Sequence, residues 1–280
     1  MKKLFLVAVT TLAAFTLKAG DHDDVITGLN VNNNTSNSLN FTSSSSGGTT
    51  KKLTFSISAG IAMPLGAFGN KGNDTNSSDQ KDTTHYNHGY AITGFHADLT
   101  ISYLITDKIG VTALAGLNAL SFDAATYKTV NGVPSTETLT ATNYSTWQFL
   151  VGPYLELPAS DKLKVDIRLL GGMVTNTFPT ITQSGSTTVP FFGTQTYSSV
   201  YSRKSGSGFG YSISAGARYN LTDAIGISLN VAYTGSSIAY TGYTQVTNYN
   251  SNSSTYNDTT LKTTLSLSIL TATVGVCYSL

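Results

Sequence analysis

Strict alternation of apolar and polar residues dominates the chain from Lys51 to its last residue. The first run has apolar side chains on one face and small or polar ones on the other, and Pro64 ends it, as a proline does at a strand boundary. A period of two sustained over ten or more residues predicts β-strands. The apolar positions, taken at every second residue, run from Leu53 to Met63, Phe95 to Ile105, Ile109 to Leu117, Trp147 to Leu157, Leu163 to Met173, Tyr211 to Tyr219, Ile225 to Tyr233 and Leu265 to Leu280.

The eighth run changes phase. Leu265, Leu267 and Ile269 alternate in one phase, whereas Leu270 and every second residue after it alternate in the other. Because a slip of one residue turns each side chain to the opposite face, we expect a β-bulge near Ile269–Leu270 or, if the strands cross a membrane, a strand end that projects beyond it. Either explanation leaves eight strands.

Short and long connections alternate between these strands. The short ones read Thr-Asp-Lys-Ile-Gly at 106–110, Ser-Asp-Lys-Leu at 160–163 and Thr-Asp-Ala-Ile-Gly at 222–226. Their hydroxyl and carboxylate oxygens can accept hydrogen bonds from nearby backbone N–H groups, which favours a tight turn. Symmetry about the second turn is expected to place Glu156 opposite Lys164, an opposite-charge pair. The long connections are 64–88, 123–143, 177–207 and 240–260, all rich in Asn, Ser, Thr, Gly and Tyr.

This layout predicts an all-β fold, an eight-stranded antiparallel up-and-down transmembrane β-barrel over residues 51–280. The short turns would face the periplasm and the long loops the outside. A soluble β-sandwich also alternates, but its strands are nearer five or six residues long and its exposed faces are polar. Here the polar face is small and rich in glycine, which suits the narrow interior of an eight-stranded barrel.

The charged side chains on the polar face form one predicted group. By parity, three acids and three bases point into the barrel, with one histidine beside them: Asp98, Glu156, Lys164, Asp166, Arg168, Arg218 and His96. Buried charges are tolerated when they are paired, so we expect a salt-bridged plug in the periplasmic half. The alternative is a narrow channel lined by the same groups.

Aromatic residues on the apolar face are expected to form two belts at the level of the lipid headgroups. Near the periplasmic ends of the strands lie Tyr103, Tyr219 and Tyr278. Nearer the other rim lie Trp147, Phe149, Phe209, Tyr211 and Tyr233.

The N-terminus has the pattern of a secretory signal. A basic start at Lys2 and Lys3, an uncharged apolar stretch and a small residue at Ala19 predict a signal peptide over 1–19 and export through the Sec pathway. Residues 20–50 are polar and low in complexity, which favours a flexible leader. Removing Lys2, Lys3 and Lys18 takes the formal charge from +1 to −2, and neither value suggests nucleic acid.

The C-terminal residues resemble the assembly signal of small outer-membrane β-barrels, a family similar to the transmembrane domain of OmpA. Thr273, Gly275, Tyr278 and Leu280 occupy its polar, glycine and two hydrophobic positions, although the family often ends in Phe or Trp. The resemblance implies lipid, lipopolysaccharide and the barrel-assembly machinery as partners. OmpA-type proteins often carry a peptidoglycan-binding domain after the barrel, and we expect no such cell-wall tether after the last strand here.

Candidate chemistry is sparse. Some eight-stranded barrels modify lipopolysaccharide, and such an enzyme would need His, Ser and an acid together near the outer rim. His85, His88 and Glu137 fall in two different long connections, and the spacing of the histidines alone does not make a metal site. We therefore expect neither catalysis nor a cofactor. We expect a bacterial outer-membrane protein with a structural or surface-interaction role, in membrane integrity or in adhesion, because its loops carry tyrosines typical of binding surfaces: Tyr240, Tyr243, Tyr249 and Tyr256.

Overall fold

The computed structural model describes residues 52–72, 85–86, 88–189, 193–250 and 252–280. The predicted signal peptide and leader lie outside the described residues. None of the helices in the described part of the chain is long and apolar enough to cross a membrane.

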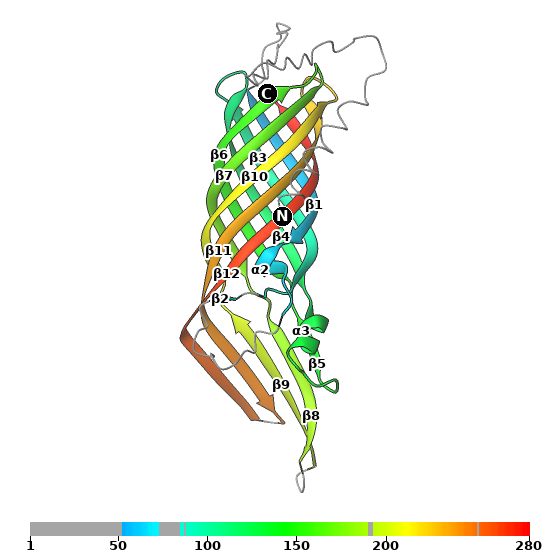
Figure 1. The fold of residues 1–280 in the computed structure, drawn as a ribbon, viewed down its shortest axis with the longest axis vertical. Helices are drawn as coiled ribbons and strands as arrows, with labels where there is room; N and C mark the ends of the chain where they lie inside the picture. Colours follow the sequence, from blue (N-terminus) through cyan, green and yellow to red (C-terminus); the bar gives the residue numbers. More distant parts are fainter. Residues whose placement is uncertain (1–51, 73–84, 87, 190–192, 251) are drawn as a thin grey trace, which may run out of the picture. The chain divides into compact units, whose positions relative to one another are not determined.

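Eight antiparallel strands close into a ring, as the alternation predicts (Figure 1). Each pairs with the strand before and after it in the ring, and the last pairs back onto the first. In ring order, the eight strands are β1 (Leu53–Pro64), β3 (Ala91–Leu104), β4 (Ile109–Phe122), β6 (Tyr144–Pro158), β7 (Leu163–Thr177), β10 (Gly206–Asn220), β11 (Ile225–Tyr249) and β12 (Asn252–Ser279).

The three short turns share one hydrogen-bond pattern. In each, two consecutive N–H groups donate to the carbonyl of the residue that opens the next strand, Ile109, Leu163 or Ile225. The N–H of that residue donates in turn to the hydroxyl of Thr106, Ser160 or Thr222, at 3.0–3.1 Å. The hydroxyl at the first position therefore accounts for the repeated sequence.

The register at the second turn differs from the expectation. Glu156 lies directly opposite Asp166, and Lys164 lies opposite Pro158. The reason is that Ala159, whose N–H donates to the carbonyl of Leu163, takes the place that Ile105 has in the first turn. The cross-strand partner of Glu156 is thus two residues further along than expected, and a shift of two leaves each side chain on its predicted face.

The expected bulge near Ile269–Leu270 is wrong. Pairing of β12 with β11 and with β1 runs through these residues without a shift. Leu265, Leu267 and Ile269 face inward and are at most 1% exposed, on the same side as Thr271 and Thr273. The strand keeps its phase, and the inner face changes from polar to apolar. The second explanation fits better, because β12 continues well past this point to Asn252.

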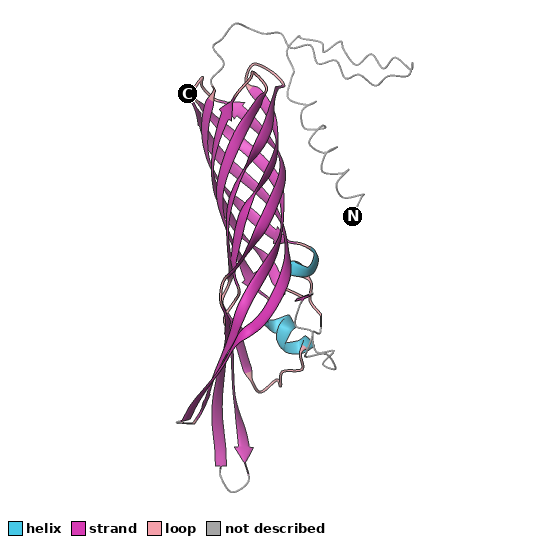
Figure 2. Cartoon of the chain, turned by 90° about the vertical axis from the view of Figure 1, so that its left-hand side faces the viewer, coloured by secondary structure: helices cyan, strands magenta, loops and turns pink. Residues whose placement is uncertain are grey.

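The long connections contain more regular structure than loops would. The first holds α2 (Gly66–Gly69) and β2 (His85–Tyr86), and the second holds α3 (Ala124–Val130) and β5 (Thr138–Ala141). The third is a hairpin of β8 (Ile181–Val189) and β9 (Gly193–Arg203), and the fourth is the continuation of β11 and β12. The far ends of β12 and β11 pair in sequence with β9, β8 and β5, so a five-stranded sheet continues from the barrel (Figure 2). We call this sheet the outer extension.

Candidate functional site: the barrel interior and the outer extension

The outward surface of the barrel is an apolar band. Ile57, Leu169 and Val274 are each more than half exposed on the outside of the closed ring. Seven of the predicted belt residues are also exposed: Tyr103, Trp147, Phe149, Phe209, Tyr211, Tyr219 and Tyr278. Tyr233 is less exposed and donates a hydrogen bond to Ser268. Such a surface is stable in contact with lipid rather than water.

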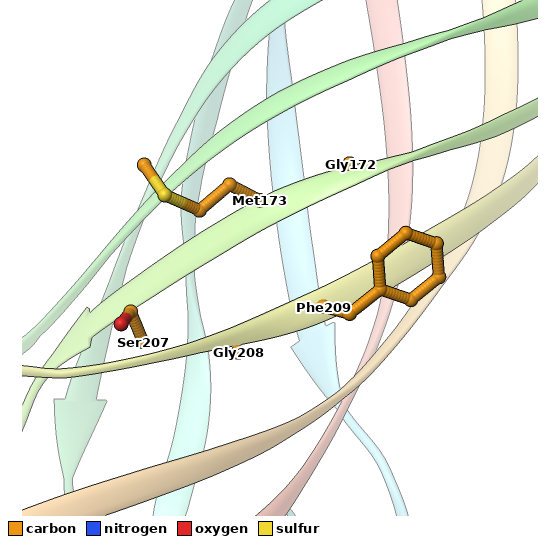
Figure 3. Close-up of a pocket in the computed structure, with 5 residues that line it drawn as sticks. All are labelled: Gly172, Met173, Ser207, Gly208 and Phe209. Atoms are coloured by element: carbon orange, nitrogen blue, oxygen red, sulfur yellow. The ribbon is translucent and has the colours of Figure 1, made fainter.

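A shallow depression of about 300 Å³ marks this surface between β7 and β10 (Figure 3). It is lined by Gly172, Met173, Ser207, Gly208 and Phe209. Its large side chains, Met173 and Phe209, are exposed members of the apolar band. The depression is therefore part of the lipid-facing surface.

Glu156 is the centre of the charged group in the half of the barrel nearer the short turns. It is 3% exposed, and its two carboxylate oxygens contact different cations. Lys164 Nζ lies 2.7 Å from Oε1, and Arg218 donates to Oε2. Arg218 also donates to the hydroxyl of Thr54 at 3.2 Å. One buried acid is thus shared between two bases on β7 and β10.

The other predicted charges pair locally. Arg168 Nε and Asp166 Oδ1 lie 2.7 Å apart on β7, in an ion pair whose angles do not make a hydrogen bond. On β3, His96 Nε2 lies 3.1 Å from Asp98 Oδ2, and the other ring nitrogen lies 2.7 Å from Asn118 Oδ1. All seven side chains of the predicted group therefore have an acidic or basic neighbour. They form three separate sets rather than one network.

The half of the barrel interior nearer the long connections is filled mainly by apolar side chains. Phe68 of α2 is fully buried, and its ring meets that of Tyr144 edge-on with centroids 4.9 Å apart. Tyr144 packs edge-on against Phe178, which packs edge-on against Tyr240. We call the following cluster the apolar plug: Ala62, Phe68, Tyr90, Ala91, Leu120, Phe122, Tyr144, Leu150, Leu170, Val174, Ile181, Ile238, Tyr240, Leu265, Leu267 and Ile269.

The segment that carries Phe68 is anchored to the neighbouring connection. Lys71 forms an ion pair with Asp123, and Tyr90 donates to the carbonyl of Gly72. Asp123 is also the N-cap of α3, since its carboxylate accepts from the N–H of Thr126 at 3.0 Å. The Lys71 hydrogen bond and the Thr126 N–H hold the pKa of Asp123 below its usual range. These contacts fix α2 over the barrel mouth.

Tyrosines of the predicted binding loops fall in two different places. Tyr240 is 2% exposed and belongs to the apolar plug, where Asn176 donates to its hydroxyl at 2.6 Å, so its assignment to a binding loop is wrong. Tyr243, Tyr249 and Tyr256 lie in the outer extension, and the last two are exposed. Sequence reasoning missed Phe68 and Tyr144 as plug residues and Phe178 as a residue packed against the plug, because isolated aromatics in polar stretches give no periodic signal.

The remaining predicted residues are placed as follows. Thr273 and Gly275 point into the barrel, and Tyr278 and Leu280 point outward. Glu137, next to β5, accepts from Gln183 Nε2 at 2.5 Å. The side chain of His85 lies outside the described residues. No group of three or more potential metal ligands occurs in the part of the chain that was described.

No protein-family model and no curated protein matches the sequence. Several solved structures are similar in fold, among them the following three. Ail, the attachment invasion locus protein of Yersinia pestis, matches at a TM-score of 0.39 and 11% identity, over 82% of this chain and 99% of its own. Neisserial surface protein A matches at 0.42 and 10%, over 81% and 97%. The outer membrane protease OmpT from Escherichia coli matches at 0.32 and 10%, over 83% and 98%.

The fold itself follows from the strand pairing within this chain. An even number of antiparallel strands, a closed ring, an apolar outer band and a charged interior together describe one architecture. The chain is an eight-stranded antiparallel up-and-down transmembrane β-barrel, with the architecture of the small outer-membrane β-barrels.

Proposed function

We propose that this protein is a bacterial outer-membrane β-barrel whose interior is closed and whose outer extension interacts with other surfaces. The observation that carries the proposal is the division of the molecule into a filled barrel and a sheet continuing from it. The barrel supplies anchorage in the membrane, and the extension supplies an exposed, tyrosine-containing surface. A role in adhesion follows from this division, and a contribution to membrane integrity follows from the barrel alone.

Several parts of the proposal come from the sequence. The signal over 1–19 would direct export through the Sec pathway, and the C-terminal residues Thr273, Gly275, Tyr278 and Leu280 would be read by the barrel-assembly machinery. The apolar band supports contact with outer-membrane lipid and lipopolysaccharide. The short turns would then face the periplasm and the outer extension the cell exterior.

A narrow channel is the second candidate, favoured by the charges inside the barrel. Two observations oppose conduction. Each of the seven predicted side chains has a partner within the interior, and the apolar plug blocks the same path further along. An eight-stranded barrel leaves room for little beyond its own side chains.

A lipid-modifying or proteolytic enzyme is the third candidate, and OmpT shows that outer-membrane barrels can be proteases. Catalysis would need a nucleophile and a base near the outer rim. His96 is 2% exposed and engaged at both ring nitrogens, so its position inside the barrel does not suit this role. The histidines nearer the outer rim, His85 and His88, belong to a different long connection from Glu137, and we propose a non-enzymatic protein.

Conductance in planar lipid bilayers tests the closed interior. The refolded full-length barrel is expected to show no steady openings, whereas regular openings with a defined conductance would support the channel. Comparison of lipid A from cells with and without the gene, by mass spectrometry, tests the enzyme. Adhesion of cells that express the protein to coated surfaces tests the interaction role.

A further inference from the structure

The two faces of the outer extension differ in their side chains. Residues directly opposite each other on antiparallel strands point to the same face, so the register assigns each side chain to a face. Tyr249 lies opposite both Asn252 and Tyr197, and Gln245 lies opposite both Tyr256 and Tyr201. One face carries the tyrosines and three glutamines: Tyr197, Tyr201, Tyr243, Tyr249, Tyr256, Gln183, Gln195 and Gln245. We call it the tyrosine face.

The opposite face has a different composition. It carries small and β-branched side chains together with asparagine, and none of its described residues is aromatic: Thr182, Ser184, Ser186, Thr196, Ser198, Val200, Ser202, Thr244, Val246, Asn248, Ser253, Thr255 and Asn257. Strand propensity alone would not separate tyrosines from threonines in this way, since both residue types favour strands. The segregation indicates that the tyrosine face is a functional surface rather than a result of strand propensity.

Hydrogen bonds hold the polar groups of the tyrosine face in place. Tyr243 donates to Gln245 Oε1 at 3.3 Å, and Gln245 Nε2 donates to the hydroxyl of Thr247 at 3.2 Å. The hydroxyls of Thr247 and Ser199 lie 3.2 Å apart. The rings of Tyr201 and Tyr243 stack nearly parallel, with centroids 6.4 Å apart. The face therefore combines aromatic rings, of which those of Tyr249 and Tyr256 are exposed, with an ordered row of amides and hydroxyls.

A second ordered group lies at the β8 side of the same face. Glu137 accepts from Gln183, and its hydrogen bond with the Tyr197 hydroxyl raises the pKa of that tyrosine. Gly185 is required here, because a Cβ would lie only 2.7 Å from Glu137 Cγ. The Glu137 side chain therefore reaches the Tyr197 hydroxyl past Gly185, where a Cβ would crowd it.

A notch of about 280 Å³ opens beside this face where β11 and β12 change register. Thr241 pairs with Lys262 but Tyr243 pairs with Asp258, so residues 259–261 form an insertion. Gly242 allows the bend with a φ of 79°. The notch is lined by Lys204, Gly242, Tyr243, Thr244, Asn257, Asp258 and Thr259.

We infer that the tyrosine face and this notch bind an uncharged glycan chain presented by a surface outside the cell. The apolar C–H face of a sugar ring packs on an aromatic ring, while its hydroxyls exchange hydrogen bonds with amides and hydroxyls at the edge. The charges that line the face and notch balance, with Glu137 and Asp258 against Arg203 and Lys204. Charge complementarity therefore favours a neutral ligand over a sulfated or phosphorylated one.

The position of the face favours a ligand beyond the membrane. Along β11, Tyr249 lies 16 residues past Tyr233 of the outer aromatic belt. At about 3.3 Å per residue this is roughly 50 Å of strand, more than the lipid headgroups span. The inference rests on the proposed outward orientation of the extension.

Binding of neutral oligosaccharides to the full-length protein in lipid nanodiscs tests the inference. The probes are maltohexaose, mannohexaose and cellohexaose, with a heparin hexasaccharide and purified lipopolysaccharide as comparison arms, measured by saturation-transfer NMR and calorimetry. We expect a neutral hexasaccharide to bind and the Y249A/Y256A variant to bind it at least about tenfold more weakly, the order expected for loss of an aromatic contact. The matched control is N248A/T255A, which changes the sequence neighbours on the opposite face and is expected to alter affinity less than about twofold.

Binding of the heparin probe or lipopolysaccharide alone would overturn the inference, as would neutral-sugar binding that survives in Y249A/Y256A. Failure of the inference can be told apart from failure of the proposed function. Cells with the Y249A/Y256A variant that still adhere to protein-coated surfaces would leave the interaction role standing without the glycan. A heat-dependent shift in gel mobility of every variant checks that the barrel has folded.

Discussion

The two halves of the barrel interior share one backbone pattern and differ in chemistry. Near the short turns, Glu156 is held between Lys164 and Arg218. Near the long connections, Phe68 and Tyr144 pack ring against ring among aliphatic side chains. Alternate residues point inward along the whole strand without a register shift. The position of a residue in this alternation therefore determines where its side chain points but not whether that side chain is polar. Each half has its own way of excluding water, and each can be broken separately.

A charge placed in the apolar half should have the largest effect. Leu267→Lys would bury an ammonium group at a position that is 1% exposed, among side chains that offer no acid. An unpaired buried charge costs several kcal/mol or more, so we expect the variant not to reach the folded, heat-modifiable form. Leu267→Met is the control, with an expected loss below about 1.5 kcal/mol. Normal folding of the lysine variant would show that water enters this half.

Removal of the central acid from the charged half should have the next largest effect. Glu156→Gln leaves Lys164 and Arg218 facing each other without a shared carboxylate. Breaking one partner of a buried ion pair costs about 3–5 kcal/mol, and urea unfolding in lipid vesicles measures the change. The triple variant E156L/K164M/R218M removes all three charges and should recover most of the loss. If the triple variant is as unstable as the single one, pairing is not what these charges contribute.

Truncation of the plug should have a similar or smaller effect on stability and a distinct effect on permeability. Phe68→Ala removes a fully buried ring, and such changes cost about 3–5 kcal/mol when the site cannot collapse. Because Phe68 lies on the short helix α2 rather than on a strand, we expect part of the loss to appear as brief channel openings in planar bilayers. Phe209→Ala, on the lipid-facing surface and 73% exposed, is the control and should leave conductance unchanged.

The anchor of α2 should give the smallest effect. The pKa of Asp123 is lowered in the folded protein, so the stability that its carboxylate contributes is complete above pH 3.8, its ordinary pKa. That stability is lost as the pH falls through the lower pKa of the folded state. Lys71 is more than one-third exposed, so solvent screens the pair and the expected contribution is below about 1 kcal/mol. Asp123→Asn keeps an effective N-cap and removes the charge, and its unfolding midpoint should depend less on pH between 5 and 3 than that of the unchanged protein. Equal dependence in the two proteins would exclude Asp123 as the titrating group.

Much of the barrel could be predicted from the sequence because one face of each strand is apolar over ten residues. A period of two was enough to assign Phe95, Leu99 and Ile101 to the outward face and Asp98 to the inward face. The same logic failed at Leu267 and Ile269, where apolar residues fill the interior and imitate a change of face. Parity cannot separate these two cases, since both produce apolar residues in alternate positions.

The outer extension and the plug were the parts that the sequence did not show. In β8 polar side chains such as Ser184 and Gln183 occupy both faces, so this strand gives no alternation to detect. The strand register at the second turn was predicted wrongly because the residue types alone do not show that Ala159 belongs to the turn. Phe68 entered the barrel from a long connection, and only the fold brings it beside Tyr144.

Contact between individual methyl groups and lipid tails tests the central claim most directly. The unchanged protein, methyl-labelled and reconstituted in bicelles, would be studied by NMR with a nitroxide placed deep in the acyl chains. We predict that the methyl signals of Val274 and Val276 broaden strongly, whereas those of Leu267 and Ile269 on the same strand stay sharp. Broadening of Leu267 and Ile269 to the same degree would contradict the account, because these side chains would then face the membrane and the apolar plug would not exist as described.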